Sequence, residues 1–184
     1  LQADDLRARI DTALASDAPE LRAAAADLLV DLDEVAAVTA LMAGVRSESL
    51  AERRAAIVSL GRCRSGGASE VLMTQGEELA GGRLPAELTL EVVEALEAHD
   101  GEQAKFFLKE YRDGFSADDP LAEWRPSMLG GDPNRGRQLF FERASLSCVR
   151  CHTIDGVGGQ VGPDLSRIGL DKNPEYLLEA IVVP

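Results

Sequence analysis

Two cysteines and a histidine are the side chains of this sequence whose types and spacing are best suited to chemistry. They lie in the stretch "SLSCVRCHTIDG", where Cys148 and Cys151 are separated by two residues and His152 follows directly. Thiols can pair as a disulfide, bind a soft metal or bond covalently to carbon, and an imidazole can bind a metal ion. The cluster therefore admits three interpretations: a haem, a zinc ion or a redox-active thiol pair.

The C-x-x-C-H spacing is that of covalent haem attachment. One helical turn brings Cys148 and Cys151 to the same side, so that each thiol can bond to one of two neighbouring vinyl groups at the porphyrin edge. His152, directly after the second thiol, can then supply the proximal nitrogen ligand of the iron. We therefore expect one covalently bound haem c that is anchored by Cys148 and Cys151 and ligated by His152.

Zinc and a redox pair are the alternatives to haem. A structural zinc site needs four ligands, and a catalytic site needs three plus water. Outside the motif only Cys63 and His99 remain as cysteine or histidine ligands, and neither belongs to a second C-x-x-C pair. A thioredoxin-type pair requires a βαβ setting, and the pattern predicts no strand near the cysteines. Both alternatives fit the sequence less well than haem does.

The residues on both sides of the cluster predict helices that would hold it. Asp132 is the expected cap of a helix that has Pro133 in its first turn and continues through "NRGRQLFFERA". Asn173 is the expected cap of a final helix, with Pro174 in its first turn. Asp, Asn and Pro are typical of these helix-start positions. The glycine-rich stretch "DGVGGQVGPDL" between the helices predicts a loop that wraps the haem edge.

Residues 1 to about 113 predict a series of short helices. Asp17 with Glu20, and Ser49 with Glu52, match the capping-box pattern at helix starts, and Pro19 fits a first turn. Apolar residues at helical spacing predict the buried faces. These are Leu21, Ala24, Ala25, Leu28 and Leu32, then Ala56, Ile57 and Leu60, and then Ala104, Phe107, Leu108, Tyr111 and Phe115.

The helical region shows weak internal similarity. "LRAAAADLL" from Leu21 aligns with "RRAAIVSLG" from Arg53 at an offset of 32 residues, and "LEVVEALEA" from Leu90 is a candidate third copy. Helix pairs that repeat at this period are typical of a solenoid, in which each unit packs only against its neighbours. The segment resembles HEAT-type repeats. The alternative is an irregular helical bundle.

Composition and charge limit the class of protein. Ala, Leu and Val supply most of the 45% hydrophobic content and aromatic residues only 4%, a mixture that favours an all-α fold. The net charge is −13, with 25 acidic and 13 basic side chains up to Met128 and 7 and 6 beyond it. Such an acidic surface argues against nucleic acid as a partner. No apolar run has the length of a membrane span.

The charge shift and the turn-forming residues divide the chain into two parts. "FSADDPLAEWRPSMLGGDP" interrupts the helical pattern with prolines, a Gly-Gly pair and acidic residues, as linkers do. We therefore expect a helical-repeat scaffold over 1–115, a linker over 116–131 and a haem-binding domain over 132–184. Because the chain begins at Leu1 rather than at methionine, we also expect it to be a piece of a longer protein.

The stretch "GRQLFFERASLSCVRCHTIDGVGGQVGPDLSRIG" resembles the cytochrome c family. That family carries a glycine and an aromatic residue four positions apart on its N-terminal helix, here Gly136 and Phe140. The resemblance implies that the glycine permits a close helix crossing and that the ring packs near the haem edge. It also implies that Pro163 accepts a hydrogen bond from Nδ1–H of His152, and that Leu165 packs on the haem face. The fold expected is a class-I-like c-type cytochrome domain.

Residues 130–184 resemble, more narrowly, the haem-binding domain of large planctomycete- and verrucomicrobial-type proteins. In those proteins HEAT-like repeats precede the haem domain, and a dehydrogenase-like propeller often precedes both. The resemblance implies an electron-transfer module, a redox partner protein or a fused dehydrogenase domain as partner, and a periplasmic or otherwise extracytoplasmic location. Whether the chain is itself an enzyme stays open at this point.

The second axial ligand of the iron is not assigned by the sequence. Cytochromes of this kind take it from a residue, usually methionine, well downstream of the motif, and no Met, His or Cys follows His152. We therefore expect a partial domain that ends before this ligand, with Met128 as a weak candidate. An open iron site that reduces a small oxidant such as peroxide is one alternative function. A non-redox scaffold with a structural metal at the cysteines is the other.

Overall fold

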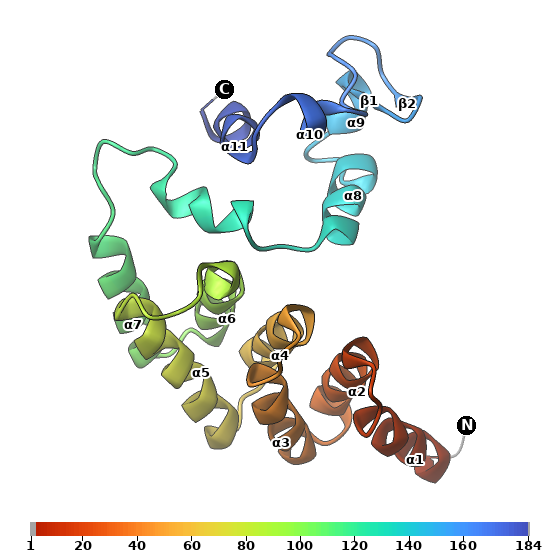
Figure 1. The fold of residues 1–184 in the computed structure, drawn as a ribbon, viewed down its shortest axis with the longest axis vertical. Helices are drawn as coiled ribbons and strands as arrows, with labels where there is room; N and C mark the ends of the chain where they lie inside the picture. Colours follow the sequence, from red (N-terminus) through yellow and green to blue (C-terminus); the bar gives the residue numbers. More distant parts are fainter. Residues whose placement is uncertain (1–2, 184) are drawn as a thin grey trace. The chain divides into compact units, whose positions relative to one another are not determined.

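The computed structural model describes residues 3 to 183, which form mainly helices and one two-stranded sheet (Figure 1). The chain separates into two compact units between Phe115 and Ser116. The expected all-α class is therefore confirmed at this coarse level. Among the described residues, no helix combines the length and the apolar character that crossing a membrane requires.

The first unit consists of seven α-helices and one 3₁₀ turn among its described residues. The elements are α1 (Ala3–Leu14), α2 (Pro19–Leu32), α3 (Glu34–Val45), α4 (Leu50–Arg62), α5 (Gly66–Ala80), η1 (Ala86–Leu88), α6 (Thr89–His99) and α7 (Glu102–Asp113). Helix α4 contacts both α2 and α6, and α5 contacts both α6 and α7. Helices α2 to α7 therefore pack against chain neighbours and against the helix two positions along the chain.

Helix α4 joins the two apolar clusters that make up the core of this unit. Its residues Ala56 and Leu60 belong to the cluster formed with α1, α2 and α3. Ile57, on another side of the same helix, belongs to the cluster formed with α5, α6 and α7. All three side chains are buried, as the sequence predicts. Cys63 is a fully buried member of the first cluster, and burial raises the pKa of its thiol.

The predicted buried face of α2 is wrong. Leu21, Leu28 and Leu32 are each more than half exposed, whereas Ala25 of the expected stripe is buried together with Ala26 and Leu29. The physical reason is the alanine-rich sequence, which presents apolar residues on two sides of the helix. Small alanines let the neighbouring helices approach more closely than a row of leucines would.

Helix starts agree with the sequence at three of the four predicted caps. Ser49 Oγ accepts a hydrogen bond from the backbone N of Glu52, Asp132 accepts one from Asn134, and Asn173 accepts one from Tyr176. The predicted cap at Asp17 is wrong, because α2 begins one residue later with Ala18 at the cap position and Pro19 in the first turn.

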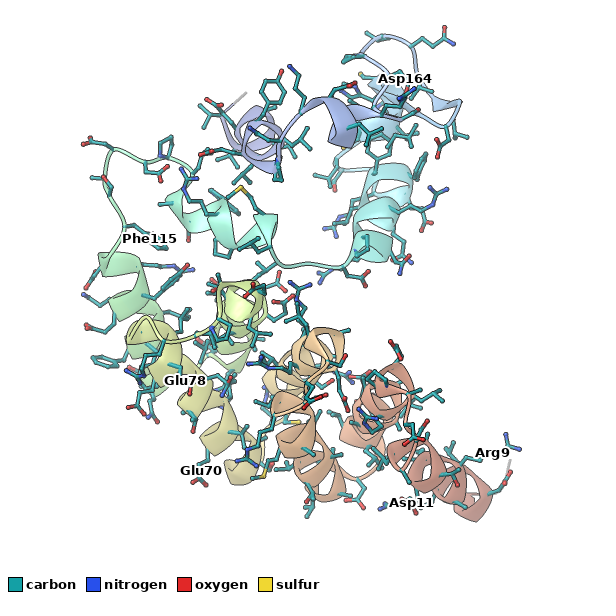
Figure 2. The ribbon with its side chains drawn as sticks, viewed as in Figure 1. Arg9, Asp11, Glu70, Glu78, Phe115 and Asp164 are labelled. Carbon is teal, nitrogen blue, oxygen red and sulfur yellow. The ribbon has the colours of Figure 1, made fainter. Side chains whose placement is uncertain are left out.

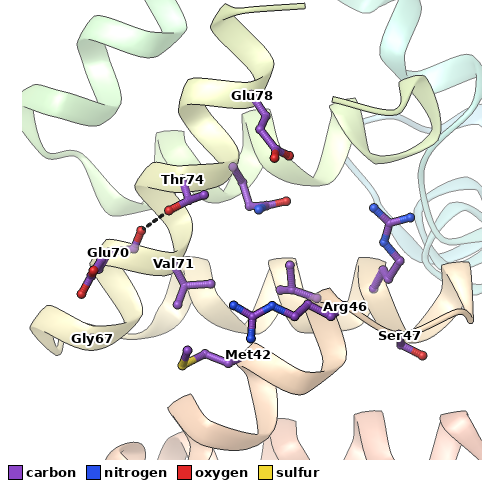
Figure 3. A pocket seen from close by; sticks show the side chains of 11 residues that line it. Met42, Arg46, Ser47, Gly67, Glu70, Val71, Thr74 and Glu78 are labelled. Atoms are coloured by element: carbon purple, nitrogen blue, oxygen red, sulfur yellow. Dashed lines mark hydrogen bonds between the residues drawn. The ribbon is translucent and has the colours of Figure 1, made fainter. Parts of the chain in front are cut away.

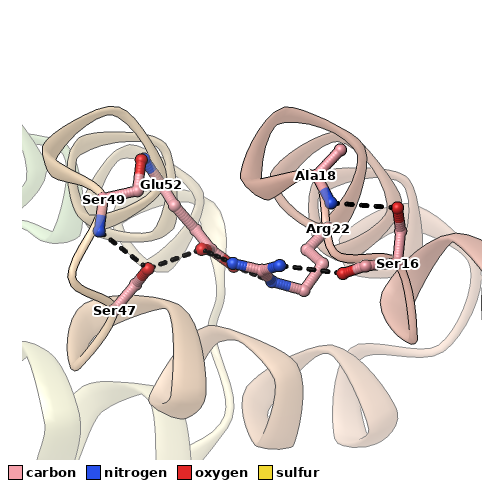
Figure 4. Close-up of polar contacts among 6 residues, drawn as sticks. All are labelled: Ser16, Ala18, Arg22, Ser47, Ser49 and Glu52. Atoms are coloured by element: carbon pink, nitrogen blue, oxygen red, sulfur yellow. Dashed lines mark hydrogen bonds and ion pairs between the residues drawn. The ribbon is translucent and has the colours of Figure 1, made fainter.

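A buried carboxylate links three helices of this unit (Figure 4). Glu52 of α4 is 6% exposed and accepts two hydrogen bonds from the guanidinium of Arg22 on α2, one of them 2.8 Å from Nε. Ser47, which follows α3, donates a third from its hydroxyl group at 2.6 Å. Arg22 also donates to the carbonyl oxygen of Ser16 at 2.8 Å. The capping-box residue Glu52 is thus used for tertiary contacts.

The second unit begins with η2 and ends with α11. Its elements are η2 (Ala122–Met128), α8 (Pro133–Glu142), α9 (Cys148–Cys151), β1 (Thr153–Ile154), β2 (Val157–Gly158), α10 (Ile168–Asp171) and α11 (Pro174–Val182). The predicted linker, residues 116–131, contains η2, which contacts α11. Arg125 of η2 pairs with Asp119 and with Glu175 of α11, and both carboxylates raise the pKa of its guanidinium.

A short hairpin follows the cysteine motif, where the sequence analysis expects no strand. Thr153 pairs with Gly158, and Ile154 pairs with Val157, in an antiparallel register. Asp155 and Gly156 form the turn with φ values of 51° and 78°. Asp-Gly is a typical pair for such two-residue turns, because both positions need positive φ. The hairpin spans only four strand residues and provides no βαβ setting.

Candidate functional site

The cysteine motif forms a single helical turn. Helix α9 runs from Cys148 to Cys151, and the backbone N of His152 donates to the carbonyl oxygen of Cys148 at 3.0 Å. Ser147 before the turn has φ 55°, a left-handed conformation that redirects the chain out of the preceding segment. Both thiols are free; that of Cys148 is half-buried and that of Cys151 is exposed. The turn therefore presents two reduced thiols one turn apart.

The imidazole of His152 is held by one hydrogen bond. Its Nδ1 lies 2.9 Å from the carbonyl oxygen of Pro163. A carbonyl oxygen can only accept, so Nδ1 must carry the proton in this contact. In the neutral ring this leaves the lone pair on Nε2, which is the tautomer that a histidine needs to bind a metal through Nε2. This is the contact that the resemblance implies for Pro163.

Gly162 brings the backbone of the loop against the face of the imidazole. An added Cβ at this position would lie 2.7 Å from Cε1 and 2.8 Å from Nδ1 of His152, closer than real Cβ contacts. The backbone N of Gly162 also donates to the carbonyl oxygen of Cys151 at 2.7 Å. The ring orientation is therefore set from two sides, by the Pro163 hydrogen bond and by the Gly162 backbone.

The rest of the glycine-rich loop is tied to the same turn. The backbone N of Gly159 donates to the carbonyl oxygen of Val149 at 2.8 Å, and Thr153 Oγ1 donates to the carbonyl oxygen of Gly159 at 2.7 Å. Neither Gly159 nor Thr153 is among the site residues predicted from the sequence. The Gly-Gly pair at 158–159 is the signal that could have identified the close approach. The loop thus follows the α9 backbone.

Leu165 and Asp164 continue this segment next to the hairpin. The backbone N of Leu165 donates to the carbonyl oxygen of Thr153 at 2.8 Å, and the Leu165 side chain is half-buried. Asp164, labelled in Figure 2, accepts hydrogen bonds from the side chain and backbone of Ser166, which lower the pKa of its carboxyl group. The Ser166 hydroxyl oxygen accepts a hydrogen bond from the backbone N of Asp155 in the hairpin turn. The loop after Pro163 is thereby fixed to the hairpin.

The other predicted site residues lie on α8 and η2. Phe140 of α8 is half-buried and packs edge-on against Phe141 at a centroid distance of 4.9 Å, and α8 contacts α9. An added Cβ at Gly136 would meet no atom within 4 Å, so no described helix crosses closely at this glycine. The close crossing that the resemblance implies stays a prediction. Met128 ends η2, whose contacts include α11. The described contacts of the His152 ring are with Pro163 and Gly162 and do not include Met128.

Apolar side chains of the second unit are mostly outside a packed core. The described residues of α8, α9, α10 and α11 include none that is buried. Several large apolar side chains are at least 47% exposed, namely Leu146, Val157, Val161, Leu170, Tyr176 and Ile181. A segment of this size normally needs a metal, a cofactor or disulfides in addition to its own core. Cys148 and Cys151 are both free in this structure.

The described part of the chain contains no group of three or more His, Cys, Asp or Glu side chains that could hold a metal ion. Cys148, Cys151 and His152 are therefore not such a group in this structure. Comparisons with known proteins add no assignment: no family model matches the chain, and neither the curated proteins nor the solved structures contain a significant match.

Proposed function

We propose that the second unit binds one haem c covalently and transfers single electrons through its iron. Cys148 and Cys151 would anchor the porphyrin, and Nε2 of His152 would be the proximal iron ligand. The observation that carries the proposal is the hydrogen bond from His152 Nδ1 to Pro163, because it fixes the tautomer and the plane of a ring that directly follows two free thiols. A partner of this kind on the remote nitrogen is typical of metal-binding histidines.

The donor set and its surroundings fit a haem better than a metal ion alone. Two thiols one helical turn apart suit two attachment points along an edge. The apolar side chains that stay exposed in this unit suit a large flat apolar group, whose contact would remove them from water. Phe140 and Leu165, both half-buried, are the candidates for contact with the ring. Burial of such side chains contributes about 25 cal/mol per Å² of apolar surface.

When bound, haem supplies a one-electron Fe(III)/Fe(II) couple. The residues of this chain would hold it: Cys148 and Cys151 would anchor it covalently, and His152, held by Pro163 and Gly162, would supply an iron ligand. We propose that the unit exchanges electrons with a redox partner protein or a fused dehydrogenase domain in a periplasmic or otherwise extracytoplasmic compartment.

We propose that the first unit is a HEAT-like repeat scaffold. The support is a set of contacts between residues about one helix pair apart. Arg22 bonds to Glu52 across 30 positions, Ser59 donates to Asp27 across 32, and Ser69 bonds to His99 across 30. Contacts at nearly constant sequence separation are typical of stacked repeats, and the interval agrees with the internal similarity of the sequence.

Spectroelectrochemical titration tests the electron-transfer proposal. The chain would be expressed with a cytochrome c maturation system, and its visible spectrum recorded while the potential is stepped in both directions. We expect one reversible transition that fits a single electron. A spectrum that does not change with potential, or one that changes irreversibly with loss of haem, would contradict the proposal.

A further inference from the structure

An open pocket of about 560 Å³ lies among α3, α4 and α5 of the first unit (Figure 3). This volume is within the range of small-molecule sites. Met42, Val45 and Val71 give the pocket an apolar part, and the remaining lining is polar or charged. The pocket contains none of the residues assigned to the haem, so the proposed function does not account for it.

Gln75 of α5 lines this pocket and is only 7% exposed. Its amide makes no hydrogen bond with any residue that the structure describes. The amide atoms are not among the buried side-chain atoms that lack a partner, so they are accessible to water or a ligand in the open pocket. An amide has both donors and an acceptor, so it can pair with the peptide group of a ligand.

Arg53 and Arg46 supply positive charge on the α3–α4 side of the pocket. Arg53 Nε is buried and has no hydrogen-bond partner within the described chain. The Arg46 side chain is exposed and likewise forms no ion pair with a described residue. By contrast, Arg22 and Arg62 of the same unit are both paired with carboxylates. Two unpaired guanidinium groups in an acidic unit favour an anionic ligand group.

Glu78 and Glu70 supply negative charge on the α5 side. In Figure 3, Arg46 crosses the pocket from the α3 side and Glu78 extends into it from α5; Glu70 lies two helical turns before Glu78 on the same helix (Figure 2). Neither carboxylate has an ion-pair partner among the described residues, so the charges of the two walls do not neutralise each other directly. A ligand with two opposite charges would satisfy both walls.

We infer that this pocket binds a short peptide with free termini, of about dipeptide size. The terminal carboxylate binds Arg46 and Arg53, the peptide group pairs with the amide of Gln75, and the terminal ammonium binds Glu78. Small apolar side chains of the peptide contact Met42, Val45 and Val71. Each ligand group thus meets a group of the pocket that has no partner within the described chain.

Binding of three probes to the ¹⁵N-labelled chain, followed by NMR, tests this inference. The probes are alanylalanine, N-acetylalanine, which has only the negative charge, and alaninamide, which has only the positive charge. We expect alanylalanine to shift amide signals of α3, α4 and α5 saturably with a millimolar or lower Kd. Loss of one charge-assisted contact corresponds to about tenfold weaker binding, which is the difference expected for either single-charge probe.

Variants separate the two walls of the pocket. Arg46→Met, at an exposed position, should weaken N-acetylalanine but not alaninamide, and Glu78→Gln should do the reverse. Gln75→Leu should weaken alanylalanine without unfolding the helices, as circular dichroism would show. Arg9→Met and Glu77→Gln, outside the pocket, serve as matched controls. Shifts that do not saturate, equal binding of alanylalanine and N-acetylalanine, or equal effects of the controls would each overturn the inference.

Discussion

At the scale of single residues, the two thiols of the motif and the imidazole of His152 are held by different parts of the chain. The thiols of Cys148 and Cys151 belong to α9, whereas the plane of the imidazole is set by Pro163 and Gly162 from the following loop. In the proposed haem site, covalent attachment and iron ligation would therefore depend on different residues. A change in the loop should therefore alter the reduction potential and the spectrum of the bound haem without releasing it.

Gly162→Ala tests this separation. The new Cβ would lie 2.7 Å from the His152 ring, so the ring or the loop must move; overpacking of this kind costs about 1–3 kcal/mol. We expect covalent haem to be retained, but with a shifted reduction potential and an altered Soret spectrum. Gly136→Ala on α8 is the control, because its Cβ meets no atom within 4 Å. If the two variants had the same spectrum as the unmodified chain, the loop would not position the ligand.

The sequence predicts the local contact between His152 and Pro163 but not all the contacts that support it. The motif residues and Pro163 are close in the chain, and one turn plus one loop determines their contacts. The Asp155–Gly156 pair is also a typical two-residue hairpin turn, although no strand is predicted on either side of it. Whether haem is bound stays a prediction.

At the scale of helices, packing between residues far apart decides what the sequence pattern leaves ambiguous. Helix α2 has apolar residues on two sides, and its neighbours select the side with Ala25, Ala26 and Leu29. Gly61 shows the same effect, because an added Cβ would lie 2.8 Å from Cα of Ala95 on α6. Local periodicity cannot choose between two apolar faces, since the choice depends on which neighbour approaches more closely.

The Glu52 cluster gives the first unit a defined pH dependence. The hydrogen bonds from Arg22, and then that from Ser47, hold the pKa of Glu52 below its ordinary value, against the effect of burial. The unfolded chain therefore takes up this proton first as pH falls. The contribution to stability is present at neutral pH and is lost below about pH 4.3, the ordinary value for Glu.

Glu52→Gln should lower the free energy of unfolding by about 2 kcal/mol at pH 7, because a half-buried Arg22 loses its charged partner. Between pH 5 and pH 3, the free energy of unfolding of the variant should also fall less than that of the unmodified chain. Urea unfolding followed by circular dichroism at several pH values measures both effects. Glu48→Gln, an exposed neighbour, is the control and should match the unmodified chain. An equal pH dependence in the two variants would show that Glu52 is not the titrating group.

At the scale of the whole chain, the two units differ in how much apolar core they contain. The first unit has buried apolar clusters along its helices, whereas the described helices α8 to α11 of the second contain no buried residue. The charge shift in the sequence indicates this division, and the compact units separate at Phe115. The segment 116–131 contains η2, which the turn-forming residues alone do not predict.

Limited chymotrypsin digestion tests the independence of the units. We expect the first cut at Phe115, where the units separate, and a helical fragment that resists further digestion with or without haem. Mass spectrometry of the early products identifies the site. The variant Cys148→Ser with Cys151→Ser should yield the same resistant fragment, while its second unit is digested faster. Early cuts at Phe106 or Phe107 within α7 would contradict an independently stable first unit.

The central claim is that Cys148 and Cys151 carry a covalent haem. The most direct measurement is haem staining after denaturing gel electrophoresis of the chain made with a cytochrome c maturation system, together with its intact mass. We predict a stained band and a mass increase of one haem, both lost in the variant Cys148→Ser with Cys151→Ser and retained in Cys63→Ser. An unstained chain with an unchanged mass would contradict the account.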